Sequence, residues 1–132
     1  MERRRFVFLS ALGAAALATP GLHCTTPNAA LDKTLSIPDM LSHLADEATI
    51  REAGVAYGSK MPGEYNVALL EKLLAGNAPN TGSDPSAGIS SRLAANIKDG
   101  FMRGNTVVVK GWVLSVTEAR QCALYTLIKK TN

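Results

Sequence analysis

Apolar residues recur at three- and four-residue intervals through most of this chain, the spacing that brings side chains onto one face of an α-helix. Residues 64–75 show the pattern most clearly, because leucines stand there beside Glu71 and Lys72. Gly76 follows, at the position where a left-handed residue commonly ends a helix. One apolar stripe is predicted on this helix, formed by Leu69, Leu70, Leu73 and Leu74.

Residues 38–60 carry the same spacing and two signals for the start of a helix. In the first, Ser36 is expected to cap the helix, and Pro38 to lie in the first turn, where its missing N–H costs nothing. The second signal is Asp46, followed by Glu47. Two signals predict either one kinked helix or two short ones, ended by the Met-Pro-Gly sequence that begins at Met61.

A further helix is predicted after residue 88. Its apolar residues step by four and stop at Gly104: Ile89, Leu93, Ile97 and Phe101. Residues 77–88, which precede it, are rich in Gly, Pro, Ser and Asn and contain no large apolar side chain. They are therefore predicted to be a flexible linker.

Residues 105–114 have a different character, because β-branched side chains dominate and Lys110-Gly111 can bend the chain between two halves. Ser115 and Glu118 then form a capping box that opens a last helix. The sequence thus predicts a mainly α fold: one small domain over residues 37–132, with four to five helices and a short extended or hairpin segment before the last helix.

The first 18 residues have the three parts of an export signal. Arginines at positions 3 to 5 form a positive region, residues 6–18 are apolar, and Ala16 and Ala18 flank Leu17 in a cleavage signature. A membrane span is disfavoured, because crossing a bilayer takes ~20 apolar residues. Cleavage after Ala18 would leave 114 of the 132 residues.

The arginines indicate which kind of export signal this is. Arg3 and Arg4, then one intervening residue, Phe6 and an aliphatic residue, resemble the twin-arginine consensus. An ordinary secretory signal with a basic start is the alternative. The twin-arginine pathway carries folded cargo, so the resemblance implies that the chain binds a cofactor before export or travels with a folded partner.

Charge excludes one class of function. The leader holds three of the 14 basic and one of the 11 acidic residues, which leaves 11 basic and 10 acidic residues and a net charge of +1. Without a basic stripe, and with few aromatic side chains on which bases could stack, nucleic-acid binding is not expected.

Residues 19–36 contain Pro, Gly, Thr and Asn and are predicted to be an irregular tether. Cys24 lies in it, and lipidation of Cys24 is an alternative that its poor lipobox disfavours. Three interpretations are open for the two cysteines: a Cys24–Cys122 disulfide, a bond from one of them to a partner subunit, or Cys122 as a small buried apolar residue.

Known catalytic and cofactor motifs are missing from the sequence. Asp39, His43 and Glu47 follow each other at intervals of four and would share one helix face, an arrangement more typical of a solvated surface than of a metal site. Neither catalytic residues nor metal or cofactor ligands are therefore predicted in this chain.

The apolar residues of the last third provide the one surface hypothesis. A short extended segment with apolar side chains on both faces has more of them than a small core accepts, so a partner interface is predicted at Phe101, Val108 and Trp112. The alternative is that Val107, Val109 and Trp112 close the core on one side and the last helix covers Val108.

The leader and residues 101–119 resemble the small subunits of periplasmic flavin-dependent sugar, polyol and gluconate dehydrogenases. The matching residues are Phe101, Gly104, Asn105, Val107 to Val109 and Thr117 to Ala119. The resemblance implies a non-catalytic subunit that carries the export signal for a larger FAD-binding subunit, and it implies a periplasmic location with the twin-arginine translocase as a second partner. A membrane tether would follow only from an uncleaved leader or a lipidated Cys24.

Three functions remain open from the sequence. The first is this accessory subunit, the second is an independent exported helical domain that binds or has a structural role, and the third is a small metal-binding protein built around His43.

Overall fold

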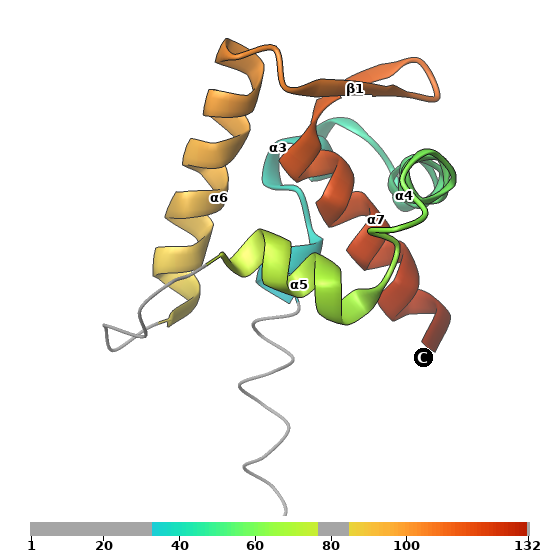
Figure 1. Cartoon of the computed structure of the whole chain (residues 1–132), viewed down its shortest axis with the longest axis horizontal. Helices are drawn as coiled ribbons and strands as arrows, with labels where there is room; N and C mark the ends of the chain where they lie inside the picture. Colours follow the sequence, from blue (N-terminus) through green and yellow to red (C-terminus); the bar gives the residue numbers. More distant parts are fainter. Residues whose placement is uncertain (1–32, 77–84, 132) are drawn as a thin grey trace, which may run out of the picture.

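The computed structural model describes residues 33–76 and 85–131, and predictions that concern residues 1–32, 77–84 and 132 lie outside the described residues. The described part is mainly helical, with a two-stranded antiparallel hairpin before the last helix, which confirms the predicted fold class (Figure 1). In chain order its elements are α3 (Asp39–Leu44), α4 (Glu47–Lys60), α5 (Val67–Ala75), α6 (Pro85–Met102), β1 (Thr106–Val109), β2 (Trp112–Ser115) and α7 (Val116–Thr131).

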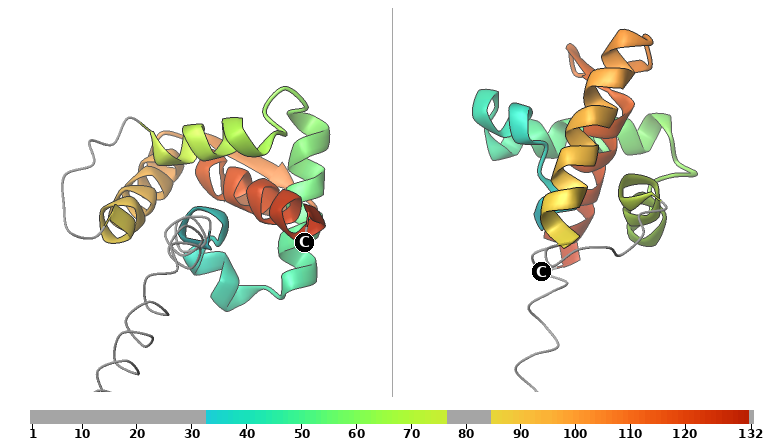
Figure 2. Two further views of the ribbon diagram at one scale, coloured as in Figure 1. Left: turned by 90° about the horizontal axis from the view of Figure 1, so that it is seen from below. Right: turned by 90° about the vertical axis from the view of Figure 1, so that its left-hand side faces the viewer.

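Helix α7 lies in the middle of the fold, and α4, α5, α6 and the hairpin all contact it (Figure 2). It begins as predicted. The Ser115 backbone N–H donates to Glu118 Oε2 at 3.0 Å, and the Glu118 N–H donates to Ser115 Oγ at 3.1 Å. Both residues are buried, so this capping box fixes the junction between the hairpin and the central helix.

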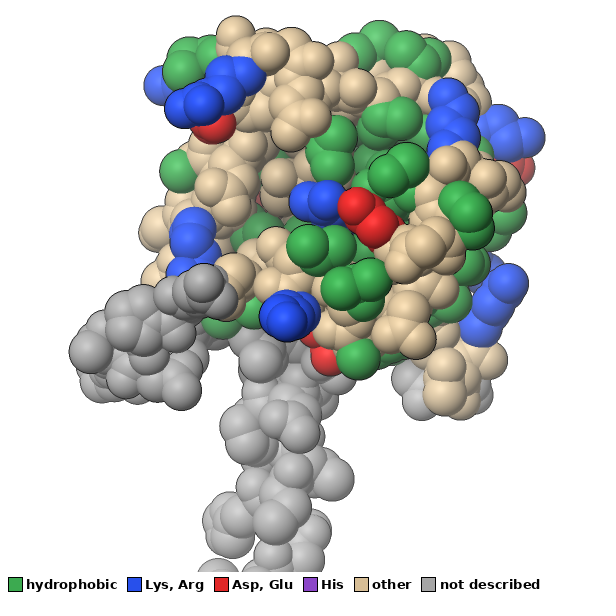
Figure 3. Space-filling model, in the orientation of Figure 1, with side chains coloured by type: hydrophobic (Ala, Val, Ile, Leu, Met, Phe, Trp, Pro, Cys, Tyr) green, Lys and Arg blue, Asp and Glu red, His purple; other side chains and the backbone are tan. Residues whose placement is uncertain are grey.

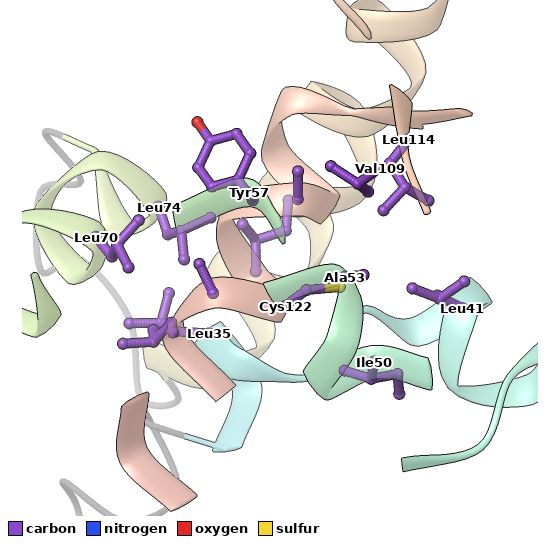
Figure 4. Close-up of a cluster of buried hydrophobic side chains, with 14 of the residues drawn as sticks. Leu35, Leu41, Ile50, Ala53, Tyr57, Leu70, Leu74, Val109, Leu114 and Cys122 are labelled. Atoms are coloured by element: carbon purple, nitrogen blue, oxygen red, sulfur yellow. The ribbon is translucent and has the colours of Figure 1, made fainter. Parts of the chain in front are cut away.

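The hydrophobic core surrounds α7 on several sides. Figure 4 shows Leu70 and Leu74 of α5 at one end of the cluster, Leu41 and Ile50 at another, and Cys122 between them. Leu35 is among the most deeply buried side chains. Residues 33–36 are helical, so the tether prediction is wrong for these four residues, because burial of Leu35 holds them against the domain.

Helices α4 and α7 pack closely where small residues meet. A Cβ atom added at Gly54 would stand 2.2 Å from the Cys122 carbonyl oxygen and 2.3 Å from Thr126 Oγ1. Thr126 Oγ1 donates to the Cys122 carbonyl oxygen at 2.9 Å and lies 3.3 Å from the Arg51 carbonyl oxygen, so it links the two helices. The absence of a side chain at Gly54 is therefore what allows the two backbones to approach.

Of the two predicted arrangements for residues 38–60, the structure has two short helices. Asp46 caps α4 as predicted, because its side chain accepts from the Thr49 N–H at 2.8 Å. The predicted cap on α3 is wrong: Pro38 occupies the N-cap position without a side-chain bond, and Ser36 is buried in the preceding helical turn.

Helix α5 begins at Val67 rather than Glu64, because the Asn66 side chain caps it by accepting from the Leu69 N–H. It ends as predicted at Gly76, which has φ 62° and donates its N–H to the Lys72 carbonyl oxygen. The predicted stripe is only half buried. Leu70 and Leu74 lie in the core, whereas Leu69 and Leu73 are exposed. Figure 3 shows hydrophobic side chains on the surface over α5.

Helix α6 begins at Pro85, so the linker prediction is wrong for residues 85–88. Proline is favoured at the first helical position, since its missing N–H has no partner there in any case. Steps of four residues drift by about 40° each around a helix with 3.6 residues per turn. This drift explains why Leu93 is buried and Phe101, two steps later, is exposed.

The hairpin forms as predicted around Lys110 and Gly111, whose φ values of 51° and 81° are those of a two-residue turn that matches the strand twist. Val109 pairs with Trp112 and Val108 with Val113. Because side chains alternate along a strand, Val109 and Trp112 share the face that packs on the core, while Val108 and Val113 share the outer face.

A polar cluster connects the loop before α5 to α7. Arg120 donates to both carboxylate oxygens of Glu64 at 2.9 Å, and the Tyr57 hydroxyl donates to Glu64 Oε2 at 2.7 Å. The hydrogen bonds from Arg120 are the main reason why the pKa of Glu64 lies below its ordinary value. Burial and the bond to Glu64 raise the pKa of Tyr57 to about 12.

The lowered pKa of Glu64 predicts an acid-dependent contribution to stability. The contribution is present above the ordinary glutamate pKa and is lost as the pH falls through the lower pKa of the folded state. We expect Glu64→Gln to cost about 1–3 kcal/mol at neutral pH and less in acid, measured by urea denaturation at several pH values. Asp99→Asn, which breaks the exposed Arg103–Asp99 pair, is the control and should cost under about 1 kcal/mol. Equal costs for Glu64→Gln at neutral and acid pH would contradict this role.

Candidate functional site

An apolar groove runs between residues 33–40 and helix α6, the two segments seen next to each other in the right-hand view of Figure 2. Its volume is about 810 Å³, and it is open along one side. The walls carry Ile37, Met40, Leu93, Ile97, Phe101 and Met102. We call these six side chains, with the space between them, the α6 groove.

Three side chains of the α6 groove are left in water. The exposed fraction is 71% for Met102, 66% for Met40 and 47% for Phe101. Large apolar side chains that gather at one place on a surface are typical of binding sites, whereas single ones are common anywhere. The α6 groove is therefore the strongest candidate for a binding site in the described part of the chain.

The floor of the α6 groove is fixed by α7. Gln121 is buried, and its Nε2 donates to the Ile37 carbonyl oxygen at 3.4 Å, which connects α7 to the wall opposite α6. The amide oxygen of Gln121 has no hydrogen-bond partner in the described residues. The groove is thus formed by three segments of sequence that only the tertiary fold brings together.

Charged residues stand around the α6 groove. Lys33 lies on one wall, Lys98 on the other, and Asp39 at the start of α3. Within residues 33–76 and 85–131, neither lysine takes part in an ion pair of 4.0 Å or less. The groove therefore combines an apolar interior with one lysine on each of its two walls.

The structure places the three predicted interface residues in different environments. Phe101 lines the α6 groove. Val108 lies on the outer face of the hairpin, 53% exposed beside Val113, and its carbonyl oxygen accepts from Lys60 Nζ. Trp112 packs against the core, as the alternative interpretation held, but the last helix does not cover Val108.

Sequence reasoning missed Ile37 and Met40 as parts of the site. Both residues lie where a helix start is predicted, and Met40 is two-thirds exposed on a six-residue helix. The sequence contains part of this information. A helix as short as α3 cannot bury all three of its large apolar side chains, Met40, Leu41 and Leu44, against the core.

Cys122 is a free thiol with none of its surface exposed, at the crossing of α4 and α7. Burial, with a smaller effect of the Glu118 charge, raises the pKa of the Cys122 thiol to about 12. The position fits the interpretation of Cys122 as a small buried residue. Cys24 lies outside the described residues.

We expect Cys122 to resist alkylation in the folded protein. Its raised pKa and full burial should slow the reaction with iodoacetamide at least about 100-fold relative to the protein in urea. Peptide mapping by mass spectrometry reads the modification at this residue alone. Failure to alkylate Cys122 in urea without a reductant would indicate a disulfide instead and contradict this expectation.

The residues considered for a metal do not assemble. Helix α3 ends at Leu44, so Glu47 belongs to the next helix, and His43 Nδ1 donates to the Asp39 carbonyl oxygen at 2.7 Å. In the described residues, no three side chains of His, Cys, Asp and Glu are grouped as metal ligands would be.

The export signal, including Arg3, Arg4, Phe6, Ala16 and Ala18, lies outside the described residues. Among the helices that the structure does describe, none has both the length and the apolar character to span a bilayer. Comparisons of this chain with protein-family models, curated proteins and solved structures find no match.

Proposed function

We propose that this chain is an exported, non-catalytic accessory subunit that binds, escorts and stabilises a larger periplasmic flavin-dependent dehydrogenase. The observation that carries the proposal is the α6 groove, where three large apolar side chains, Met40, Phe101 and Met102, gather around one hollow and remain exposed. Apolar side chains of this kind can remain exposed on a folded domain. Covering them with a partner removes apolar surface from water and so favours binding.

Two features of the sequence connect the groove to this class of partner. The twin arginines Arg3 and Arg4 resemble a signal for export of folded cargo, which gives a bound partner a reason to travel with the chain. The C-terminal third resembles the small subunits of flavin-dependent dehydrogenases, and it contains Phe101 and the adjacent Met102 of the groove. FAD would then belong to the larger subunit.

The test is recovery of the chain with its partner. We expect an affinity-tagged chain, purified from a periplasmic extract of its native host, to carry one larger protein in stoichiometric amount and the absorbance spectrum of a flavin. Recovery of the tagged chain only as a monomer would contradict the proposal and favour an independent exported domain. The tag should stand at the C-terminus, since the export signal occupies the other end.

A further inference from the structure

The α6 groove has the dimensions of a site for one helix. Its α6 wall presents Leu93, Ile97 and Phe101 at intervals of four residues, which at 1.5 Å per residue extends over ~12 Å, or about two helical turns. The opposite wall is made of one helical turn at residues 33–36, a break at Ile37 and Pro38, and the start of α3. An open apolar channel along one face of α6 accepts a second helix, which inserts apolar side chains at i, i+3 or i+4, and i+7.

The composition of the walls fits such an occupant. Met40 and Met102 are unbranched and polarisable, and methionine side chains adapt to the shape of an inserted leucine or phenylalanine. Phe101, next to Met102 in sequence, supplies a large ring to the groove. The exposed fractions of these three side chains show that no part of the described chain covers them.

The charges at the rim indicate the chemistry of the occupant. Lys33 and Lys98 stand on opposite walls and have no ion-pair partner in the described residues, whereas the one rim carboxylate, Asp39, lies in the first turn of α3. A helix seated between the two lysines gains from acidic residues on both of its flanks. Basic flanks would bring like charges together.

We infer that the α6 groove binds an amphipathic helix of the partner subunit, with an apolar stripe of about two turns flanked on both sides by Asp or Glu. This inference rests on the proposed function and names the segment of the partner that the accessory subunit holds. A second copy of the chain, a detergent-like amphiphile and a membrane are the competing occupants.

The methionines of the chain provide a direct assay. The full-length chain is labelled with ¹³C at the methionine methyl groups and titrated with a synthetic helical peptide that has leucines at i, i+3 and i+7 and glutamates on both flanks. We expect the Met40 and Met102 resonances to shift on binding. Met61, at the C-cap of α4 and outside the groove, should not shift and is the internal control.

Variants test the apolar and the charged parts separately. Phe101→Glu should weaken binding of the peptide at least tenfold, whereas Val113→Glu, at a residue exposed to a similar degree outside the groove, should leave binding unchanged. Lys98→Glu should weaken binding two- to fivefold and improve binding of a second peptide with lysine flanks. Lys72→Glu on α5 is the matched control and should do neither.

Three results would overturn the inference. They are equal affinity for the two peptides, shifts of Met40 and Met102 that depend on protein concentration without peptide, and shifts caused by phospholipid vesicles but not by peptide. The inference and the proposed function can fail independently of each other. If the larger protein is recovered from the periplasm equally well with the Phe101→Glu variant, the accessory role stands and the α6 groove is not the site that binds the partner.

Discussion

Replacement of Gly54 by alanine is expected to destabilise the protein by about 2–4 kcal/mol. Within a helix, alanine is by itself more favourable than glycine by up to about 1 kcal/mol. The steric cost of the added methyl group must therefore exceed this amount. The new methyl group would stand 2.2 Å from a backbone carbonyl oxygen of α7, which cannot turn away as a flexible side chain would. Helices α4 and α7 would therefore have to separate, and the core around Cys122 and Ala53 would lose contacts.

The matched control is the same substitution in another helix. A Cβ atom added at Gly88 in α6 meets nothing within 4 Å, so Gly88→Ala should be neutral or stabilise by up to about 1 kcal/mol. Urea denaturation followed by circular dichroism measures both. If Gly54→Ala were as stable as Gly88→Ala, the close packing of α4 on α7 would be wrong.

Leu70→Ala is expected to cost about 2–5 kcal/mol, because Leu70 has no exposed surface and its removal leaves a cavity between α5 and α7. The fully buried Leu74 on the next turn would lose a neighbour in the core cluster as well. A loss of this size is a large part of the stability of a domain of this length. The measurement is the free energy of unfolding in urea.

Leu69→Ala provides the comparison within the same helix. Its side chain is 37% exposed, so truncation removes less buried surface and should cost under about 1.5 kcal/mol. Equal costs at the two adjacent leucines would mean that the buried face of α5 has been assigned wrongly.

Local signals in the sequence predicted local structure well. Ser115 and Glu118 form the capping box, Lys110-Gly111 forms the hairpin turn, and Gly76 ends α5, because each depends on residues within a few positions of one another. These features together define a mainly helical chain with one hairpin, and the structure confirms that class.

Predictions that required knowledge of tertiary neighbours were less successful. The stripe on α5 is wider than its contact with α7, so Leu69 remains exposed. Residues 33–36 were assigned to a tether from composition, yet Leu35 finds a place in the core that no local pattern reveals. A short apolar sequence is stabilised by what packs on it, not by its own propensity.

The candidate site illustrates the same limit. Phe101 was identified because it is large and apolar, but its partners in the groove come from residues 33–40, more than sixty positions earlier in the chain. Trp112 was identified for the same reason and packs on the core instead. Hydrophobicity alone does not separate a core residue from a binding residue, since both lose water when covered.

The location of the larger flavoprotein, once identified by co-purification, tests the accessory role most directly. The double variant Arg3→Lys with Arg4→Lys is expressed with that flavoprotein, and flavin-dependent dehydrogenase activity is assayed in periplasm and cytoplasm. We predict that both proteins stay in the cytoplasm, because the proposed accessory role makes export of the partner depend on the signal of this chain. Undiminished flavoprotein activity in the periplasm would contradict the account, since the partner would then be exported independently.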